Sequence, residues 1–296
     1  MRALLPSAVV LLLHSSAWAQ DPLVVDVQRL AASQNNDDRF TALTELLRAR
    51  GVTFTVEPFT LDTPVGSEPR TTGRNIVATF GEGADELVLG AHYDAARLPD
   101  GTLSMGAVDN AASSVMLAGV AQALRAERLQ TRVRVVWFDM EEIGLAGSTR
   151  YLQAHAGDRI GAMLNFDING YGDTTIFGAP AGGENARLRR TILQTCAELA
   201  VDCVRFAAMP PGDDRSFGKA GVPTLSIAHL PAIEAHQLWL LLHAGASSGL
   251  APGATPPILR TIHTADDVAS KVDGATIARA QRLALAVLQN LMRSPN

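Results

Sequence analysis

The sequence predicts an α/β protein, a single domain in which a three-layer α/β/α sandwich surrounds a mixed, mostly parallel sheet. Segments with the pattern of strands alternate with segments in which apolar residues recur at helical spacing. Strands joined by helices pair mainly in parallel and need helices on both faces of the sheet. The chain has 296 residues, 47% of them hydrophobic, and no fixed-period repeat divides it. One continuous core is therefore expected.

The elements follow in order from these patterns. Extended segments are expected at residues 53–59, 75–80, 86–92, 133–138, 162–166, 174–177 and 224–228. Helices are expected as two short ones within residues 23–50, and then at residues 109–128, 147–156, 184–200 and 277–291. The fourth extended segment, V-R-V-V-W-F, is apolar except for Arg134, which is typical of a central strand. Gly81 and Gly83 separate the second and third segments, and this spacing predicts a hairpin-type turn.

The first 19 residues differ from the rest of the chain. Arg2 supplies a positive start, residues 8–13 are apolar, and residues 17–19 form a small-x-small cleavage pattern. This predicts a signal peptide over residues 1–19 and an exported mature domain, periplasmic or secreted, over residues 20–296. A membrane anchor needs about 20 apolar residues. No second hydrophobic segment of spanning length follows, so no membrane span is expected after cleavage.

The charge balance argues against nucleic acid as a partner. The chain carries 25 Lys and Arg against 30 Asp and Glu, a formal net charge of -5, and its basic residues are scattered. Phosphate backbones are held by a basic field. The sequence therefore predicts no nucleic-acid binding, and it leaves the oligomeric state open.

The two cysteines, Cys196 and Cys203, are seven residues apart. Export places them in a compartment where a disulfide persists. Cys196 falls on the apolar face of an expected helix, and Cys203 begins the strand that returns beneath it. A disulfide and two free buried thiols both fit this pattern. In exported protein we expect the bridge.

Polar side chains gather where the extended segments end, which is where parallel sheets bind ligands. His92 and Asp94 are two residues apart, so both point to one side of an extended chain. A carboxylate there can accept the second ring N–H of a metal-bound imidazole. Asp109 precedes an expected helix, where an N-cap role is the ordinary alternative.

An adjacent pair of carboxylates, Glu141 and Glu142, follows the apolar strand. Burying two acids is costly unless a positive charge neutralises them. Because successive residues of an extended chain point opposite ways, one glutamate can bind a cation while its neighbour stays free as a base. A further acid, Asp167, follows the next strand, and His263 begins an H-T-x-x-D stretch downstream.

The other histidines have plainer interpretations. His14 leaves with the signal peptide, and His155 is expected on a solvated helix surface. His236 and His243 share a helix face about 10 Å apart, too far to chelate one ion. His229 follows a strand, so it is a candidate for contacting a substrate at the mouth of the site.

Together these segments resemble the two-zinc aminopeptidases, which include secreted bacterial leucyl aminopeptidases and, more distantly, glutamate carboxypeptidase and transferrin receptor. The motifs A-H-Y-D, G-A-x-D-N-A, F-x-x-E-E-x-G-L-x-G-S, N-x-D and H-T-x-x-D occur here in family order. They cover the chain from about Asn75 to its end. The glutamate-pair motif is the most specific of them.

The resemblance implies roles for these residues. The implied metal ligands are His92 and Asp167 for one zinc ion, Glu142 and His263 for a second, and Asp109 as the bridge between them. Glu141 would be the general base, and Asp94 would be the partner of His92. Two imidazoles and three carboxylates suit Zn²⁺, and a zinc pair acidifies a shared water. The implied function is a zinc peptidase domain that hydrolyses the first residue of peptides with a free N-terminus.

A weaker motif lies at residues 212–223, which resemble S-D-H-x-x-F-x-x-x-G-[IV]-P. Asp213 occupies the family's Asp position and is a candidate substrate contact. Gly212 and Asp214 stand where the family has Ser and His. The substrate side of this loop therefore departs from the pattern.

Two other functions stay open. Animal-type glutaminyl cyclases share this fold and several of these acids, but they cyclise an N-terminal Gln at a single zinc. That group carries Trp immediately before its last ligand histidine, where this chain has Ile262. A non-catalytic, receptor-like relative is the second alternative. The complete ligand set and the retained base argue against it.

Overall fold

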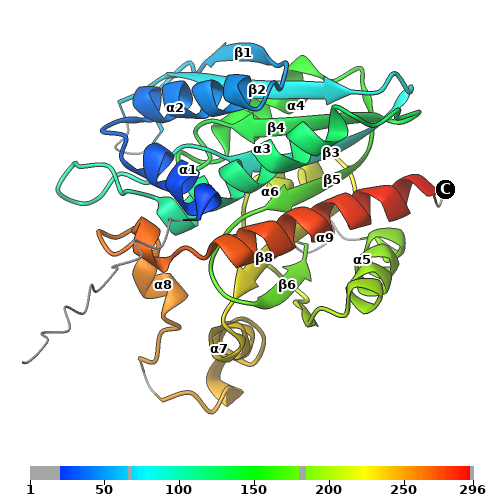
Figure 1. The fold of residues 1–296 in the computed structure, drawn as a ribbon. Helices are drawn as coiled ribbons and strands as arrows, with labels where there is room; N and C mark the ends of the chain where they lie inside the picture. The colour runs from blue at the N-terminus through cyan, green and yellow to red at the C-terminus, as the bar shows by residue number, and fades with distance from the viewer. Residues whose placement is uncertain (1–20, 66–68, 180–184, 252, 294–296) are drawn as a thin grey trace, which may run out of the picture.

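An eight-stranded sheet lies at the centre of the protein, in a computed structural model that describes residues 21–65, 69–179, 185–251 and 253–293 (Figure 1). The strand order is β1-β2-β4-β3-β5-β8-β6-β7. The strands are β1 (Thr55–Thr60), β2 (Thr72–Phe80), β3 (Asp85–His92), β4 (Arg132–Phe138), β5 (Arg159–Phe166), β6 (Thr174–Gly178), β7 (Cys203–Arg205) and β8 (Thr224–Leu230). The pairs β4–β3, β3–β5, β5–β8 and β6–β7 are parallel, and the other three are antiparallel. The sheet is therefore mixed and mostly parallel, as predicted.

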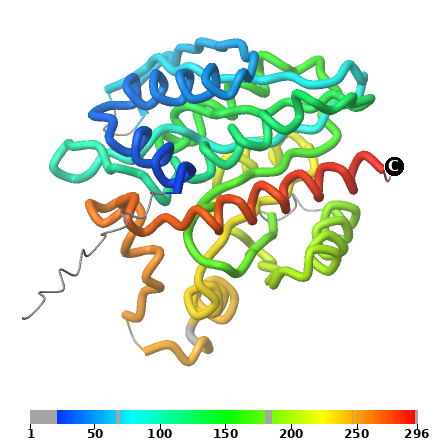
Figure 2. Tube along the Cα trace, in the orientation of Figure 1, coloured from blue at the N-terminus to red at the C-terminus, as the bar shows by residue number. Residues whose placement is uncertain are grey.

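Helices cover both faces of this sheet, which confirms the three-layer α/β/α architecture (Figure 2). They are α1 (Pro22–Ala31), α2 (Asn36–Ala49), α3 (Ala112–Leu124), α4 (Ala146–Ala154), α5 (Ala186–Leu199), α6 (Asp214–Lys219), α7 (Ala232–His243), α8 (Ile258–Thr261) and α9 (Gly274–Arg293). On one face α9 contacts α1, α3 and α5, while α4 and α6 contact each other and strands on the opposite face. β4 serves both layers: Val135 and Trp137 join the larger core, and Val136 and Phe138 join the smaller one.

The glycine turn between β2 and β3 is not a hairpin, so that prediction is wrong. Both strands pair with β4, which lies between them. The chain at residues 81–84 instead crosses close to the backbone that precedes β4. A Cβ at Gly81 would lie 2.4 Å from Thr131 O, and one at Gly83 would lie 2.3 Å from Gln130 O. The two glycines therefore permit a close backbone crossing.

The long helix begins later than the sequence predicts. A π-helical turn, η1 (Ala107–Ala111), precedes α3, and Asp109 within it has the non-helical angles φ -117° and ψ 90°. Ala111 occupies the N-cap position of α3. The helix-cap alternative for Asp109 is therefore excluded.

His155 is not on a solvated surface, which corrects the prediction. Its side chain is 17% exposed at the end of α4. Its Nδ1 lies 2.8 Å from Asp158 Oδ2, and its Nε2 lies 3.1 Å from Glu57 Oε1 on β1. The ring packs against Tyr151 with 4.3 Å between centroids. The acid on β1, far away in sequence, draws this histidine inward.

Cys196 and Cys203 form a disulfide, which confirms the expected bridge. It joins the last turns of α5 to the edge strand β7, with 6.2 Å between the Cα atoms. Among the described residues, no helix is long and apolar enough to cross a membrane. The predicted signal peptide at residues 1–19 lies outside the described residues.

Candidate metal centre

The predicted site residues meet at the edge where the central parallel strands end. β3 ends at His92, the Glu141 and Glu142 pair follows β4, and Asp167 follows β5. β4, β3 and β5 are parallel neighbours, so their carboxyl ends lie side by side. We name six side chains the candidate metal centre: His92, Asp109, Glu141, Glu142, Asp167 and His263.

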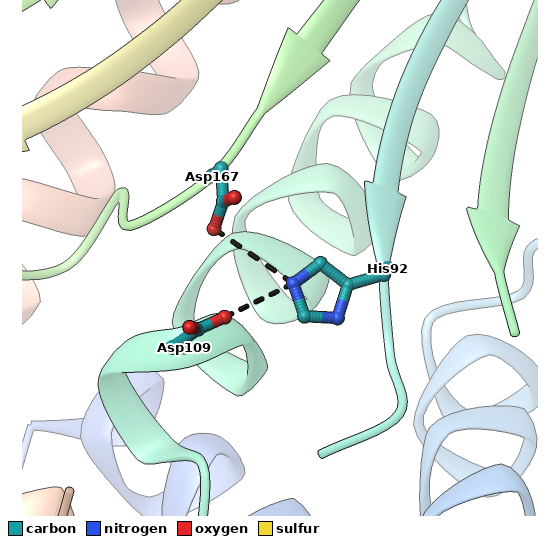
Figure 3. A group of neighbouring side chains, drawn as sticks. All are labelled: His92, Asp109 and Asp167. Atoms are coloured by element: carbon teal, nitrogen blue, oxygen red, sulfur yellow. Dashed lines mark ion pairs between the residues drawn. The ribbon is translucent and has the colours of Figure 1, made fainter. Parts of the chain in front are cut away.

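One half of the centre surrounds His92 (Figure 3). Its Nε2 lies 3.0 Å from Asp109 Oδ1 and 3.8 Å from Asp167 Oδ1. The imidazole is 3% exposed. Its other nitrogen, Nδ1, lies 3.2 Å from the backbone oxygen of Asp94 and 3.4 Å from Asp94 Oδ1. The ring is thereby aimed with Nε2 toward the two carboxylates.

The second half of the centre surrounds His263. Its Nε2 lies 3.1 Å from Asp109 Oδ2 and 3.1 Å from Glu142 Oε2. The side chain of His263 is 54% exposed, whereas that of Asp109 is 7% exposed. Asp109 therefore presents one carboxylate oxygen to each histidine and joins the two halves.

Asp94 contacts the turn with the glutamate pair as well as His92. Its carboxylate accepts hydrogen bonds from Glu141 N at 3.1 Å and Glu142 N at 3.2 Å. The turn that carries the glutamate pair is thus fixed to the end of β3. The H-x-D pattern predicted the contact with His92, but it gave no sign of the contact with the glutamate turn.

Asp267 is a supporting residue that the sequence analysis missed. Its carboxylate accepts hydrogen bonds from Val108 N at 2.6 Å and Asp109 N at 3.1 Å. Asn110 adds a second tie, because its side chain bonds to Phe166 O and to Ile168 N on both sides of Asp167. These bonds hold the Asp109 backbone out of helical geometry. The H-T-x-x-D motif contains Asp267, and that motif was the available signal.

Negative charge dominates the electrostatics of the centre. Burial raises the pKa of Glu141 well above its usual value, and the nearby Asp213 and Glu142 carboxylates raise it further. Burial, with repulsion from Asp109, raises the pKa of Glu142 to about 7. Hydrogen bonds to Asp109 and Glu142 raise the pKa of His263 to about 11. Repulsion of this kind is relieved when cations bind between the carboxylates.

The donor atoms are placed as a metal ion requires. Three groups of side chains have ligand atoms within 4.8 Å of one another: His92 with Asp109 and Asp167, His92 with Glu141 and Glu142, and Asp109 with Glu142 and His263. Within the part of the chain that the structure describes, buried Glu142 Oε1 and Asp167 Oδ1 have no hydrogen-bond partner. Imidazole and carboxylate donors suit Zn²⁺. The residues therefore fit a metal site.

A largely apolar cavity of about 500 Å³ opens beside the centre. Asp109, Glu141, Asp167 and His263 form its polar side. Its apolar walls include Ile168, Ile176, Met209, Leu230, Leu238, Ile258, Leu259 and Ile262. These walls come from β6, β8, α7 and α8 and from the connections that carry Ile168, Met209 and Ile262. The segment after β8 therefore completes the cavity.

Asp213, one of the two predicted substrate contacts, lies next to the centre. It is 1% exposed just before α6. Among the described residues, its two carboxylate oxygens and those of Asp214 have no hydrogen-bond partner. Burial raises the pKa of Asp213 to about 7, opposed by the nearby His92. The structure places Asp213 beside the other acids, and its contact with substrate stays a prediction.

His229, the other predicted substrate contact, is not among the residues that line the cavity. It is 0% exposed on β8, with Nδ1 2.9 Å from Asn169 Oδ1 and Nε2 3.1 Å from Thr175 Oγ1. Burial lowers its pKa to about 3. Its neighbours Ala228 and Leu230 line the cavity instead. Side chains alternate along a strand, so this geometry corrects the substrate role to a structural one.

Residues 75–288 match peptidase family M28. The chain belongs to this family. The matched segment includes the whole candidate metal centre, and it confirms the resemblance that the motifs carried. Family membership also confirms the prediction of a hydrolase of the metallopeptidase class.

Named relatives come from two enzyme classes. A probable leucine aminopeptidase of Arthroderma benhamiae is 25% identical over 239 residues, which cover 75% of this chain and 57% of that protein. The chain thus spans less than two thirds of that relative's length. Porphyromonas gingivalis glutaminyl cyclase superposes with a TM-score of 0.71 and 19% identity, covering 90% of this chain and 96% of that one. BSAP, a zinc aminopeptidase from Bacillus subtilis, gives 0.57 and 18%, covering 74% and 50%. These two structures show that the fold is shared.

Proposed function

We propose that this protein is an exported, zinc-dependent aminopeptidase that removes the first residue of peptides with a free N-terminus. The position of Asp109 carries the proposal. Its two carboxylate oxygens lie 3.0 Å from His92 Nε2 and 3.1 Å from His263 Nε2. A carboxylate between two imidazoles is suited to be shared by two metal ions. Membership of peptidase family M28 supports peptide hydrolysis at this site.

Two zinc ions per chain are proposed. The proposed ligands are His92 and Asp167 for one ion, Glu142 and His263 for the other, and Asp109 for both. Zinc bound there would supply the Lewis acidity that acidifies a water and stabilises charge on an attacked carbonyl.

Glu141 is the proposed general base. It lines the cavity, and its carboxylate lies within 4.8 Å of ligand atoms of His92 and Glu142. Outside the proposed ligand set, it is free to take a proton from the attacking water and return it to the leaving amine. Asp94 acts through His92, whose ring it orients.

The cavity favours an apolar first residue in the substrate. Burying a Leu, Ile, Phe or Met side chain against aliphatic walls is favourable by roughly 1.5–3 kcal/mol. On the polar side, carboxylates such as Glu141 and Asp167 offset the charge of the substrate's amino group as it loses water. Substrates are therefore peptides that begin with Leu, Met or a similar residue.

Matched peptides test this function. Leu-, Lys- and Asp-initiated peptides, each free and N-acetylated, are incubated with zinc-loaded protein, and released amino acids are measured by mass spectrometry. We expect rapid release from the free Leu peptide, slower release from the charged ones, and none from the acetylated forms. Internal fragments, or equal cleavage of acetylated peptides, would contradict an aminopeptidase. Zinc analysis of the same sample is expected to give two equivalents.

Export has a separate test. Cleavage after residue 19 predicts that protein recovered outside the cytoplasm begins at Gln20. Amino-terminal sequencing of that protein decides it. Recovery of the intact amino terminus in the cytoplasm would contradict export and leave the peptidase proposal untouched.

Glutaminyl cyclase is the second candidate. The observation in its favour is the fit to the P. gingivalis glutaminyl cyclase, which this chain covers almost completely. Against it stands Ile262, where the animal-type enzymes carry Trp before the last ligand histidine. A Gln-initiated peptide separates the two. Ammonia release without a freed amino acid would establish the cyclase.

A further inference from the structure

Arg39 is a buried cation that lies outside the family match. It belongs to α2 and is 0% exposed, whereas the match begins at residue 75. Burial lowers its pKa, and the carboxylates of Asp94, Asp267 and Asp109 oppose that effect. A buried guanidinium is costly unless its donors are satisfied. The partners of those donors indicate its role.

The guanidinium of Arg39 donates to backbone carbonyls in three segments. Its longest bond runs from Nη1 to Leu30 O of α1 at 3.5 Å, and the shorter bonds reach two segments beside the candidate metal centre. Nε donates to Tyr93 O at 2.6 Å. Nη1 donates to Met105 O at 2.8 Å, and Nη2 donates to Gly106 O at 3.1 Å. A planar fork with several donors makes such a set of bonds, whereas the single ammonium of lysine does not match it.

Both segments carry residues of the proposed zinc site. Tyr93 lies between His92 and Asp94, and Gly106 lies three residues before Asp109. Arg39 therefore bonds to the backbone next to one proposed ligand and just before another. This one side chain therefore connects the carboxyl end of β3 to the start of η1.

The backbone at Gly106 has no room for a side chain. Gly106 has φ 51°, and a Cβ there would lie 2.6 Å from Asp109 O and 2.8 Å from Ala95 Cβ. Arg39 holds the carbonyl of Gly106, and Asp267 accepts the amides of the following residues from the other side. The backbone that presents Asp109 is thus held through its carbonyls and through its amides.

We propose that Arg39 is a positioning residue for metal binding, which sets the separation between His92 and Asp109 by joining their backbones. The inference rests on the proposed zinc site. It assigns part of that site to the amino-terminal helices. Arg39 contacts backbone oxygens and is not proposed to touch metal or substrate.

The charge of Arg39 and its hydrogen bonds predict opposite changes in metal affinity when Arg39 is replaced. If its positive charge were what mattered, removing it would tighten the binding of a dication by lowering repulsion. If its hydrogen bonds matter, removing them weakens binding even when the charge is kept. Arg39→Met removes charge and bonds, and Arg39→Lys keeps the charge while losing the fork.

The test titrates Co²⁺ into metal-free wild type, Arg39→Lys and Arg39→Met, with the visible spectrum as readout. Supporting groups around ligands typically change metal affinity about 10- to 100-fold. We expect both variants to bind Co²⁺ at least tenfold more weakly, with an altered spectrum. Zinc should also raise the melting temperature of both variants less than it raises that of wild type.

Arg134→Met is the matched control. Arg134 is another largely buried arginine, but its partners Glu86 and Asp158 lie at the opposite end of the strands. We expect Arg134→Met to lower the melting temperature while keeping wild-type Co²⁺ affinity and spectrum. Folded Arg39 variants with wild-type affinity, or tighter binding by Arg39→Met, would overturn the proposal. So would failure of both Arg39 variants to fold in excess zinc. If wild type itself binds no Co²⁺ or Zn²⁺, the proposed zinc site is what fails.

Discussion

Two buried charge clusters lie at opposite ends of β3 and β4, and they differ in charge balance. Near the start of these strands, Arg134 Nη1 lies 3.1 Å from Glu86 Oε1 and 2.7 Å from Asp158 Oδ2. Both of these acids are paired with Arg134, and His155 also contacts Asp158. At the other end, the candidate metal centre has four carboxylates and two imidazoles.

The difference separates a structural network from a functional one. A buried network whose charges are paired internally is complete without a ligand. A cluster with more carboxylates than imidazoles, in which burial and repulsion raise the pKa values of Glu141 and Glu142, is suited to cations from outside. The same sheet therefore pairs acids with Arg134 and His155 at one end, and at the other end it gathers four carboxylates around two imidazoles.

The largest expected effect comes from Glu141→Gln. The amide cannot accept a proton from water, so turnover should fall about 10²- to 10⁴-fold. Zinc content should stay at the wild-type value because Glu141 lies outside the proposed ligand set. Activity on a Leu-initiated peptide and metal analysis of the same sample check both points.

Glu142→Gln is the matched control for this prediction, because it alters the adjacent carboxylate. It should lower zinc content first. If Glu141→Gln loses metal and Glu142→Gln keeps it, the two roles are exchanged.

The second prediction compares two histidines that each lie between two carboxylates. His263 lies between Asp109 and Glu142, and His155 lies between Glu57 and Asp158. His263→Ala should lose about one of the two proposed zinc equivalents and weaken binding at least tenfold, on the scale of a lost ligand contact. His155→Ala should retain all its zinc. Equal zinc contents in the two variants would remove the distinction between the clusters.

The sequence predicted the proposed ligands because their chemistry is local. His92 ends β3, Asp167 directly follows β5, and Glu142 lies in the turn after β4; parallel strands bring such ends together. Supporting contacts were harder to predict. Arg39 acts on carbonyl groups, which every residue type offers, so no sequence pattern marks Tyr93 as its partner.

Three predictions were wrong because the contacts involved depend on strand order, on the alternation of side chains along a strand, or on a residue far away in sequence. The glycine turn was interpreted as a hairpin because the sequence does not reveal that β4 inserts between β2 and β3. His229 was placed at the mouth of the site, but it is one residue out of phase with Ala228 and Leu230. His155 was placed in solvent because its partner Glu57 is 98 residues away.

A third prediction concerns the cavity beside the candidate metal centre. Leu259 lines it and is 38% exposed, so a substitution there is compatible with folding. Leu259→Glu places a charge where an apolar side chain should dock. It should reduce kcat/KM for a Leu-initiated peptide about 10- to 200-fold and favour Lys-initiated peptides in relative terms.

Ile233→Glu is the control for the cavity. Ile233 is 73% exposed on α7, and it is not among the residues that line the cavity. This variant should keep the wild-type ranking of peptides. If both variants shift the ranking equally, general surface charge explains the effect and the cavity does not select the side chain.

The smallest expected effect concerns pH at the paired end of the strands. The hydrogen bond to Glu57 on β1 raises the pKa of His155 above 6.5; burial opposes the shift, Asp158 supports it, and Arg134 on β4 opposes it. The ring also packs on Tyr151 of its own helix. A histidine whose pKa is raised by folding stabilises the native state below its unfolded pKa, and it loses this contribution as pH rises through the folded value.

His155→Gln should therefore cost stability at pH 6 and less at pH 9. Because the group is partly exposed, solvent screening limits the effect to roughly 0.5–1 kcal/mol. Urea unfolding of both proteins at the two pH values, with zinc held in excess, measures the difference. An equal cost at the two pH values would mean that His155 stabilises this end of the sheet by packing on Tyr151. A cost that grows toward pH 9 would have the wrong sign for an ion pair with a protonated histidine. Loss of bound zinc from His155→Gln at pH 6 would couple the two ends of the strands and contradict their separation.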